Sequence, residues 1–237
     1  MTKRQRAVWQ VFPDAATLYL QAANVILDSA RAALAARSVF HLVLAGGRTP
    51  RGVYTRLAQF PLDWGKWHIY FSDERCLPLG DMQRNDMMVR SAWLNRIAIP
   101  AANIHSIRAE LGAERGAQRY SETLAPVPDF DFVLLGLGED GHTAGLFPGH
   151  TLGTADTSPT VLPVHAAPQP FSERISLSIR RLNQTRQAMF LVTGEEKRAA
   201  LAAWWGGAEV PAAHIAAPQT FVWCDAQAAG GLAEAIK

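Results

Sequence analysis

Cysteines are scarce in this sequence, and long apolar runs are absent. The two cysteines, Cys76 and Cys224, lie far apart without Cys-x-x-Cys spacing, which argues against a disulfide framework or a zinc knuckle. No stretch reaches the ~20 consecutive apolar residues that a transmembrane helix needs. Residues 1–6 are basic, but Pro13 and Asp14 interrupt the next segment before an apolar run of signal-peptide length accumulates. We therefore expect a soluble, untargeted protein of the reducing cytoplasm.

The sequence also lacks an excess of charge of either sign. Charged residues make up 19% of the 237 residues and the formal net charge is +2, so no general field attracts nucleic acid or a membrane. An anionic ligand must therefore be bound by local basic groups. Because 49% of the residues are apolar, the chain can bury a sizeable core. We expect a single domain over residues 1–237, with a monomer favoured and without nucleic-acid or membrane partners.

Apolar segments of strand length alternate with segments of helical periodicity. The alternation begins with a helix after Pro13, for which Asp14 is a suitable N-cap, and another helix is expected to begin near Pro50. The other expected elements are strands at residues 40–44, 67–71, 130–135, 174–179 and 188–192, and helices at residues 195–204 and 226–236. This alternation predicts an α/β fold with a largely parallel sheet. The proline-rich residues 158–170 are expected to form a long loop.

Three of the loops that come after the expected strands have unusual compositions. Ligands of open α/β sheets bind outside the carboxyl ends of the strands, where helix N-termini present unpaired amide groups. The first loop, residues 45–50 (AGGRTP), has adjacent glycines that allow close approach to an anion, and a threonine hydroxyl. Phosphate binding and an ordinary strand-to-helix turn explain it equally well, since it is neither a Walker motif nor a complete dinucleotide fingerprint.

The second and third loops carry charged groups and a histidine. Residues 72–78 (SDERCLP) place a carboxylate suited to a sugar hydroxyl beside a guanidinium suited to a phosphate. Taken alone, however, this loop slightly favours a solvated turn with a local ion pair. Residues 136–149 (GLGEDGHTAGLFPG) place His142 two residues after Asp140, a carboxylate that can fix its tautomer. A lone histidine is more often structural, but a core histidine does not need so many glycines, so we favour a functional His142.

Together these segments resemble the 6-phosphogluconolactonase family, which belongs to a wider group of Rossmann-like sugar-phosphate enzymes that includes glucosamine-6-phosphate deaminase. The resemblance covers most of the chain, and residues 136–149 are its most specific part. It implies a Rossmann-like sheet with helices on both faces, and hydrolysis of 6-phospho-D-glucono-1,5-lactone, a pentose phosphate pathway reaction, without a cofactor. The substrate-binding residues that it implies are Gly46, Gly47, Arg48, Thr49, Asp73, Arg75, Asn85, Arg174 and Lys197.

Two segments depart from the family pattern. Ala45 and Arg48 replace the serines of the usual Ser-Gly-Gly-Ser-Thr-Pro segment, so two hydroxyl donors are absent. Arg48 either gives the phosphate a positive partner or points to solvent. Arg84 stands where a serine often precedes Asn85. These departures concern the substrate contacts and leave the expected reaction class unchanged.

The chemistry of lactone opening assigns a role to His142. Opening a cyclic ester with water needs a base and donors that stabilise the oxyanion, and it needs no metal. An ordinary histidine pKa of ~6.5 allows proton acceptance near pH 7, so we predict that His142 is the general base. The resemblance implies that Asp140 orients it, with Asp73 as the rival. Residue type alone would make Arg174 and Lys197 surface charges, so their predicted role depends on the resemblance.

Three alternatives compete with this interpretation. A metal site at His142, His150, Glu139 and Asp140 is not expected, because the spacing is not His-Glu-x-x-His and residues 148–149 (PG) break any helix. A sugar-phosphate deaminase or isomerase shares the Asp-Gly-His segment, although the residues directly after this segment resemble the lactonase. A non-catalytic sugar-phosphate sensor stays open, but no DNA-reading module or basic stripe accompanies it.

Overall fold

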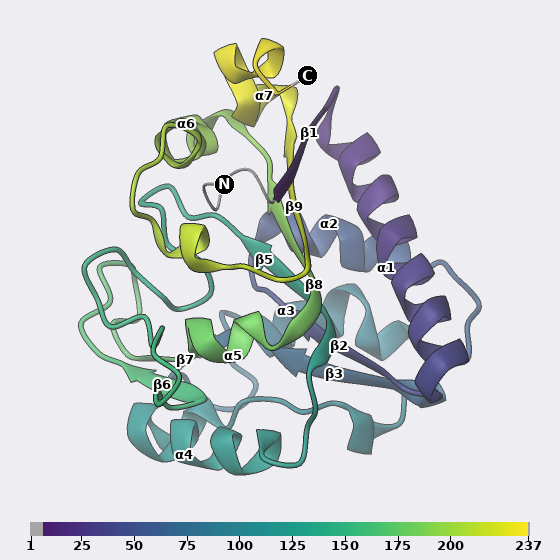
Figure 1. The fold of residues 1–237 in the computed structure, drawn as a ribbon. Helices are drawn as coiled ribbons and strands as arrows, with labels where there is room; N and C mark the ends of the chain where they lie inside the picture. The colour runs from purple at the N-terminus through teal and green to yellow at the C-terminus, as the bar shows by residue number, and fades with distance from the viewer. Residues whose placement is uncertain (1–6, 237) are drawn as a thin grey trace.

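The computed structural model describes residues 7–236, so the basic segment 1–6 lies outside the described residues. Within them, six parallel strands form a sheet in the order β1-β9-β8-β5-β2-β3 (Figure 1). Their bounds are β1 Ala7–Phe12, β2 Phe40–Leu44, β3 Trp67–Phe71, β5 Phe130–Gly136, β8 Thr185–Val192 and β9 Gln219–Asp225. A second, antiparallel sheet has the order β4-β7-β6, with bounds β4 Asp73–Arg75, β7 Arg174–Leu177 and β6 Val161–Val164. The predicted α/β fold with a largely parallel sheet is confirmed.

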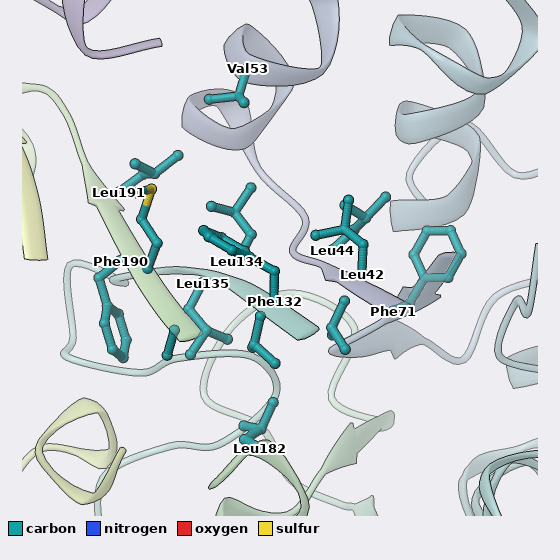
Figure 2. Packing of buried hydrophobic residues seen from close by; sticks show 14 of the residues in the cluster. Leu42, Leu44, Val53, Phe71, Phe132, Leu134, Leu135, Leu182, Phe190 and Leu191 are labelled. Carbon is teal, nitrogen blue, oxygen red and sulfur yellow. The ribbon is translucent and has the colours of Figure 1, made fainter. Parts of the chain in front are cut away.

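Helices flank the six-stranded sheet. Their bounds are α1 Ala15–Arg37, α2 Arg48–Leu57, α3 Asn85–Ala92, α4 Ala113–Leu124, α5 Ile179–Asn183, α6 Arg198–Trp205 and α7 Ala226–Ala229. Val53 of α2 and Leu182 of α5 lie on opposite sides of strands β2, β5 and β8 (Figure 2). The expectation of helices on both faces is therefore confirmed. Among the described residues, no helix is long and apolar enough to cross a membrane.

The first helix and the central strands show why the sequence folds in this way. Asp14 caps α1 by accepting a hydrogen bond from the main-chain nitrogen of Thr17 at 2.7 Å. Leu18, Ala22 and Ile26 recur at helical spacing and are fully buried against the sheet. Strand β5 is buried almost throughout, as expected for a central parallel strand that is covered on both faces.

Several elements differ from the sequence-based expectations. The strand predicted at residues 174–179 belongs to the antiparallel sheet. It ends at Leu177, because Ser178 caps α5 by accepting from the main-chain nitrogen of Arg181. The helix predicted at residues 226–236 is α7 followed by the 3₁₀ turn η8, Gly230–Glu234, since adjacent glycines disfavour a continuous helix. Strands β1 and β9 were not predicted, and they pair along one edge of the parallel sheet. The long loop predicted at residues 158–170 is interrupted by strand β6, because this segment pairs with β7.

Three histidines gather beside Tyr70 near the amino-terminal ends of β2 and β3. His41 and His68 are neighbours in the strand register, and His68 Nδ1 lies 3.1 Å from His105 Nε2. The Tyr70 ring stacks on His105 with centroids 4.5 Å apart. Burial lowers the pKa of all three histidines, to about 4 for His105, and repulsion between the rings lowers the pKa of His41 and His105 further. The cluster is therefore neutral in the folded protein at pH 7.

We expect the folded protein to lose stability as the pH falls from about 6.5 towards about 4. In this window the unfolded histidines bind protons while those of the folded cluster do not, so protonation stabilises the unfolded state. The melting temperature should be lower at about pH 5 than at about pH 7.5, and His105→Gln should reduce this difference.

His165→Gln is the matched control for this experiment. His165 is exposed, and a hydrogen bond to Glu114 raises its pKa, so its contribution has the opposite sign and is lost as the pH rises. Its replacement should not reduce the difference in melting temperature. The same pH dependence in the wild type and in His105→Gln would contradict the assignment to the cluster.

Candidate functional site

A cavity of about 620 Å³ opens at the carboxyl ends of the parallel strands. Its walls come from the residues that follow β2, β5 and β8, together with Asp73 and Asp225 at the ends of other strand segments. Parallel strands end at the same edge of a sheet, which brings these distant segments together. The size and position are those of a site for a small molecule.

The residues predicted from the sequence meet at this cavity. Those that line it are Gly46, Gly47, Arg48, Thr49, Asp73, Arg75, Asn85, His142, Arg174 and Lys197. Asp140 contacts His142 from beside the cavity wall. The structure therefore places every predicted site residue within one region.

A hydrogen-bonded pair of side chains, Asp140 and His142, stands at one wall of the cavity. His142 Nδ1 lies 2.5 Å from Asp140 Oδ1, and the main-chain nitrogen of His142 donates to the same oxygen at 3.1 Å. With Nδ1 directed at the carboxylate, Nε2 is the ring nitrogen left to accept a proton. Asp73, the rival orienting partner, instead accepts hydrogen bonds from Ser72 Oγ and Asn85 Nδ2.

The glycine-rich loop is shaped around this pair. A Cβ atom at Gly138 would lie 2.0 Å from His142 Nδ1 and 2.5 Å from Asp140 Oδ1, so no side chain fits there. The main-chain nitrogen of Gly138 donates to the carbonyl oxygen of His142 at 2.7 Å, and the Phe147 ring packs 4.8 Å from the imidazole. Burial raises the pKa of Asp140, but hydrogen bonds from Gln169 and His142 outweigh it and lower the pKa overall. The aspartate is therefore held as an anion.

The loop before α2 forms another wall. Gly47 is the N-cap of α2 and has no side chain to occupy the first-turn amides, which leaves them available to an anion. A Cβ atom at Gly46 would lie 2.0 Å from Asn85 Oδ1, so this position needs glycine. Thr49 Oγ1 lies 2.7 Å from Thr193 Oγ1. Arg48 is 85% exposed and pairs with Glu196 at 2.6 Å, so its guanidinium lies at the solvent-facing rim.

Two basic side chains face the cavity with capacity for an anion. Arg75 donates from Nη1 to the carbonyl oxygen of Gln83 at 2.5 Å, while its buried Nε has no hydrogen-bond partner among residues 7–236. A buried donor without a partner is costly and points to a ligand or water as its partner. Lys197 Nζ lies 3.6 Å from Glu139 Oε1, and the lysine side chain is only 20% exposed.

Arg174 is a buried residue, in contrast to the surface charge that its residue type alone favours. It is 5% exposed, and it donates to the carbonyl oxygens of Pro170 at 2.9 Å and Phe171 at 3.3 Å. Burial lowers its pKa, and the nearby carboxylates of Asp73 and Asp140 oppose this shift. Arg174 thus connects the cavity to the loop between β6 and β7.

A network of buried charged side chains holds Asn85 in position. The Glu74 carboxylate caps α3 by accepting from the main-chain nitrogens of Asn85 at 2.8 Å and Asp86 at 2.9 Å. Burial raises the pKa of Glu74 to about 7, and these hydrogen bonds oppose the shift. Arg84 is 1% exposed and lies 3.1 Å from Asp86 and 3.2 Å from Glu110. The arginine that replaces the family's serine is therefore a buried counter-ion.

Arg84→Ala should lower the free energy of unfolding by ~3–5 kcal/mol, because it leaves buried carboxylates without their cation. Urea unfolding followed by circular dichroism measures this loss. Arg31→Ala is the matched control, since its pair with Asp28 has both side chains about 70% exposed (69% and 71%), and it should cost at most ~1 kcal/mol. Equal losses in the two variants would contradict the buried-network account.

Some cavity residues were missed by sequence reasoning. Thr193 directly follows the strand predicted at residues 188–192, so the strand-end rule could have found it. Asp225 ends β9, which was not predicted, and accepts from the main-chain nitrogens of Gly194 at 3.1 Å and Ala228 at 2.8 Å. Within the described part of the chain, no group of three histidine, cysteine, aspartate or glutamate residues could hold a metal ion.

A parallel sheet, a glycine-rich loop at a helix N-terminus and basic side chains around one cavity are typical of α/β proteins that bind phosphorylated small molecules. The family model described as "Glucosamine-6-phosphate isomerases/6-phosphogluconolactonase" matches residues 13–223. The chain belongs to this family, which confirms the resemblance found in the sequence.

Individual relatives agree with the family match. The chain is 34% identical to a 6-phosphogluconolactonase of Mycobacterium leprae over 231 residues, covering 90% of this chain and 93% of that protein. It is 38% identical to a 6-phosphogluconolactonase of Synechocystis over 178 residues, covering 71% and 72% of the two chains. The crystal structure of 6-phosphogluconolactonase from Thermotoga maritima superposes with a TM-score of 0.84 at 29% identity, covering 92% of this chain and 99% of that one.

Proposed function

We propose that this protein hydrolyses 6-phospho-D-glucono-1,5-lactone to 6-phosphogluconate, with residues 1–237 acting as one domain. The names of its relatives support the substrate and the reaction class. The observation that carries the proposal is the contact of 2.5 Å between His142 Nδ1 and Asp140 Oδ1 at the wall of a cavity that also presents a glycine-rich helix N-terminus. The cavity thus combines a base with an anion-binding loop.

In the proposed mechanism, His142 acts as the general base. Nε2 removes a proton from water as the water oxygen bonds to the lactone carbonyl carbon, and the carbonyl electron pair moves onto oxygen. The tetrahedral oxyanion then collapses, the ring ester bond breaks, and the leaving ring oxygen takes the proton from the imidazolium. Asp140 orients the ring and stabilises its charged form. Main-chain amides of residues 136–141 stabilise the oxyanion.

The phosphate of the substrate is proposed to lie at the loop of residues 46–49. The amides at the start of α2 supply donors and a favourable dipole end, and Arg75 and Lys197 supply positive charge. Asp73 and Asn85, which hydrogen-bond to each other, are placed to contact sugar hydroxyls. Arg174 shapes this part of the wall through its bonds to the neighbouring loop.

His142→Asn should lower kcat for lactone hydrolysis by ~10²–10⁴-fold, the usual contribution of a general base. The assay generates the lactone in place with a coupled dehydrogenase and subtracts its spontaneous hydrolysis in the absence of protein. Circular dichroism and the melting temperature verify that the variant folds. Turnover close to that of the wild type in a folded variant would exclude the general-base role.

Lys197→Met and Arg75→Met should each raise KM by about tenfold or more while changing kcat little, because they remove charge-assisted bonds to a group that does not react. Arg198→Met is the matched control, since Arg198 lies next to Lys197 in the chain but pairs with Glu195 on the surface. Unchanged kinetics in both Lys197→Met and Arg75→Met would refute the phosphate role.

The family description also names glucosamine-6-phosphate isomerases, so amino-sugar chemistry is the second candidate. Ammonia release from glucosamine 6-phosphate identifies that activity directly, whereas acid production from the lactone identifies hydrolysis. A sensor without catalysis would bind 6-phosphogluconate and turn over neither substrate. Parallel assays with one preparation therefore separate the three functions.

A further inference from the structure

The loop between β6 and β7 reaches the side of Asp140 that faces away from His142. Gln169 in this loop donates from Nε2 to Asp140 Oδ2 at 3.0 Å. The other carboxylate oxygen, Oδ1, receives the ring and main-chain nitrogens of His142. Both oxygens of Asp140 are therefore engaged, and the orientation of the carboxylate depends on donors from two separate segments.

Residues of the cavity hold the tip of this loop in an unfavourable backbone conformation. Ala166 and Phe171 both have positive φ, 52° and 65°, a left-handed conformation that is strained for residues other than glycine. The main-chain nitrogen of Ala167 donates to the carbonyl oxygen of Ser172 at 2.9 Å and closes the tip. Arg174 binds the carbonyl oxygens of the strained segment. These contacts place Gln169 against Asp140.

Phe171 adds a further link between this loop and the cavity. The guanidinium of Arg75 lies 5.7 Å from the centroid of the Phe171 ring, within the usual range of a cation–π contact. The loop therefore rests on Arg75 and Arg174, two side chains that line the cavity. The tip of the loop is therefore coupled to the site.

We propose that Gln169 is a positioning residue for the proposed base His142. By donating to Oδ2, the Gln169 amide holds Asp140 in the orientation in which Oδ1 accepts from His142 Nδ1, so that Nε2 stays the proton acceptor. The catalytic consequence rests on the proposed function, whereas the effect on the charge of His142 does not.

The Gln169 amide is a neutral donor among charged side chains. Asp140 interacts electrostatically with Arg174 of β7, and Lys197 forms an ion pair with Glu139, the residue before Asp140. An amide stabilises the Asp140 anion without adding charge, so the proton affinity of His142 depends on the residue at position 169. A carboxylate there raises this affinity and an ammonium lowers it.

The test is a charge series at position 169, with kinetics measured across pH. Gln169→Ala should lower kcat about tenfold with KM within about twofold, because a bond to a charged acceptor is lost. The acidic limb of the kcat/KM profile should move to higher pH in Gln169→Glu and to lower pH in Gln169→Lys. A loop that acted only as a structural support would give no such opposite displacement.

His165→Gln serves as the matched control in the same loop. His165 pairs with Glu114 and Glu173 on the surface, so its replacement disturbs the loop base without touching Asp140. Its kcat and the position of its acidic limb should match those of the wild type. A displaced limb in His165→Gln would show that any disturbance of the loop produces the effect, and would overturn the specific role of Gln169.

A titration of the His142 ring by NMR gives a readout that does not require activity. The ring signal is assigned from its loss in His142→Asn, and its midpoint is compared in the wild type, Gln169→Glu and Gln169→Lys. Opposite displacements support the proposal, and coincident midpoints overturn it. Absence of lactone turnover in the wild type would reject the proposed function, while the NMR midpoints would still decide whether Gln169 acts on His142.

Discussion

The hydrogen bond between His142 and Asp140 is possible only because position 138 has no side chain. Any Cβ atom there would overlap both members of the pair. The loop must therefore turn closely around the imidazole, and its first residue, Gly136, pairs with Leu191 of β8. The position of the proposed base thus depends on a strand, a glycine and a carboxylate two residues before the histidine, all within one short segment.

A second close contact joins the loop before α2 to the buried charge network. Gly46 lies against the Asn85 side chain, and Asn85 begins a helix whose first amides are capped by the buried carboxylate of Glu74. Arg84 offsets the charge of that carboxylate from within the protein. A buried carboxylate is tolerated only when hydrogen bonds and a counter-ion compensate its desolvation. The position of Asn85 at the cavity wall therefore depends on the buried charges of Glu74 and Arg84.

The loop between β6 and β7 connects these parts to the second sheet. Arg174 begins β7, and its guanidinium contacts the loop that carries Gln169. The antiparallel sheet thus supports the loop at the edge of the site. This sheet also explains why the strand expected at residues 174–179 does not extend the parallel sheet, since β7 pairs with β4 and β6.

Local patterns were sufficient to predict the strands that lead into the site. Apolar runs that end at glycine or polar residues predicted β2, β3 and β5, and the motif at residues 136–149 identified His142 together with its family. Edge strand β1 alternates between exposed and partly buried residues, and β9 was missed beside it, so Asp225 was missed as well. In the sequence, Arg84 was recognised only as a departure from the family pattern. Its burial was not predicted, because the burial of a charge depends on partners such as Glu110 that are distant in the sequence.

The sequence by itself determined the α/β fold, the family and the identity of most side chains around the cavity, because each depends on residues close together in the chain. Only the tertiary structure decided that Asp140 rather than Asp73 contacts His142, that Arg48 lies at the exposed rim, and that Gln169 reaches Asp140. These contacts depend on how segments distant in the sequence meet at the common edge of the parallel strands and on which way each side chain points, and spacing along the chain does not encode either.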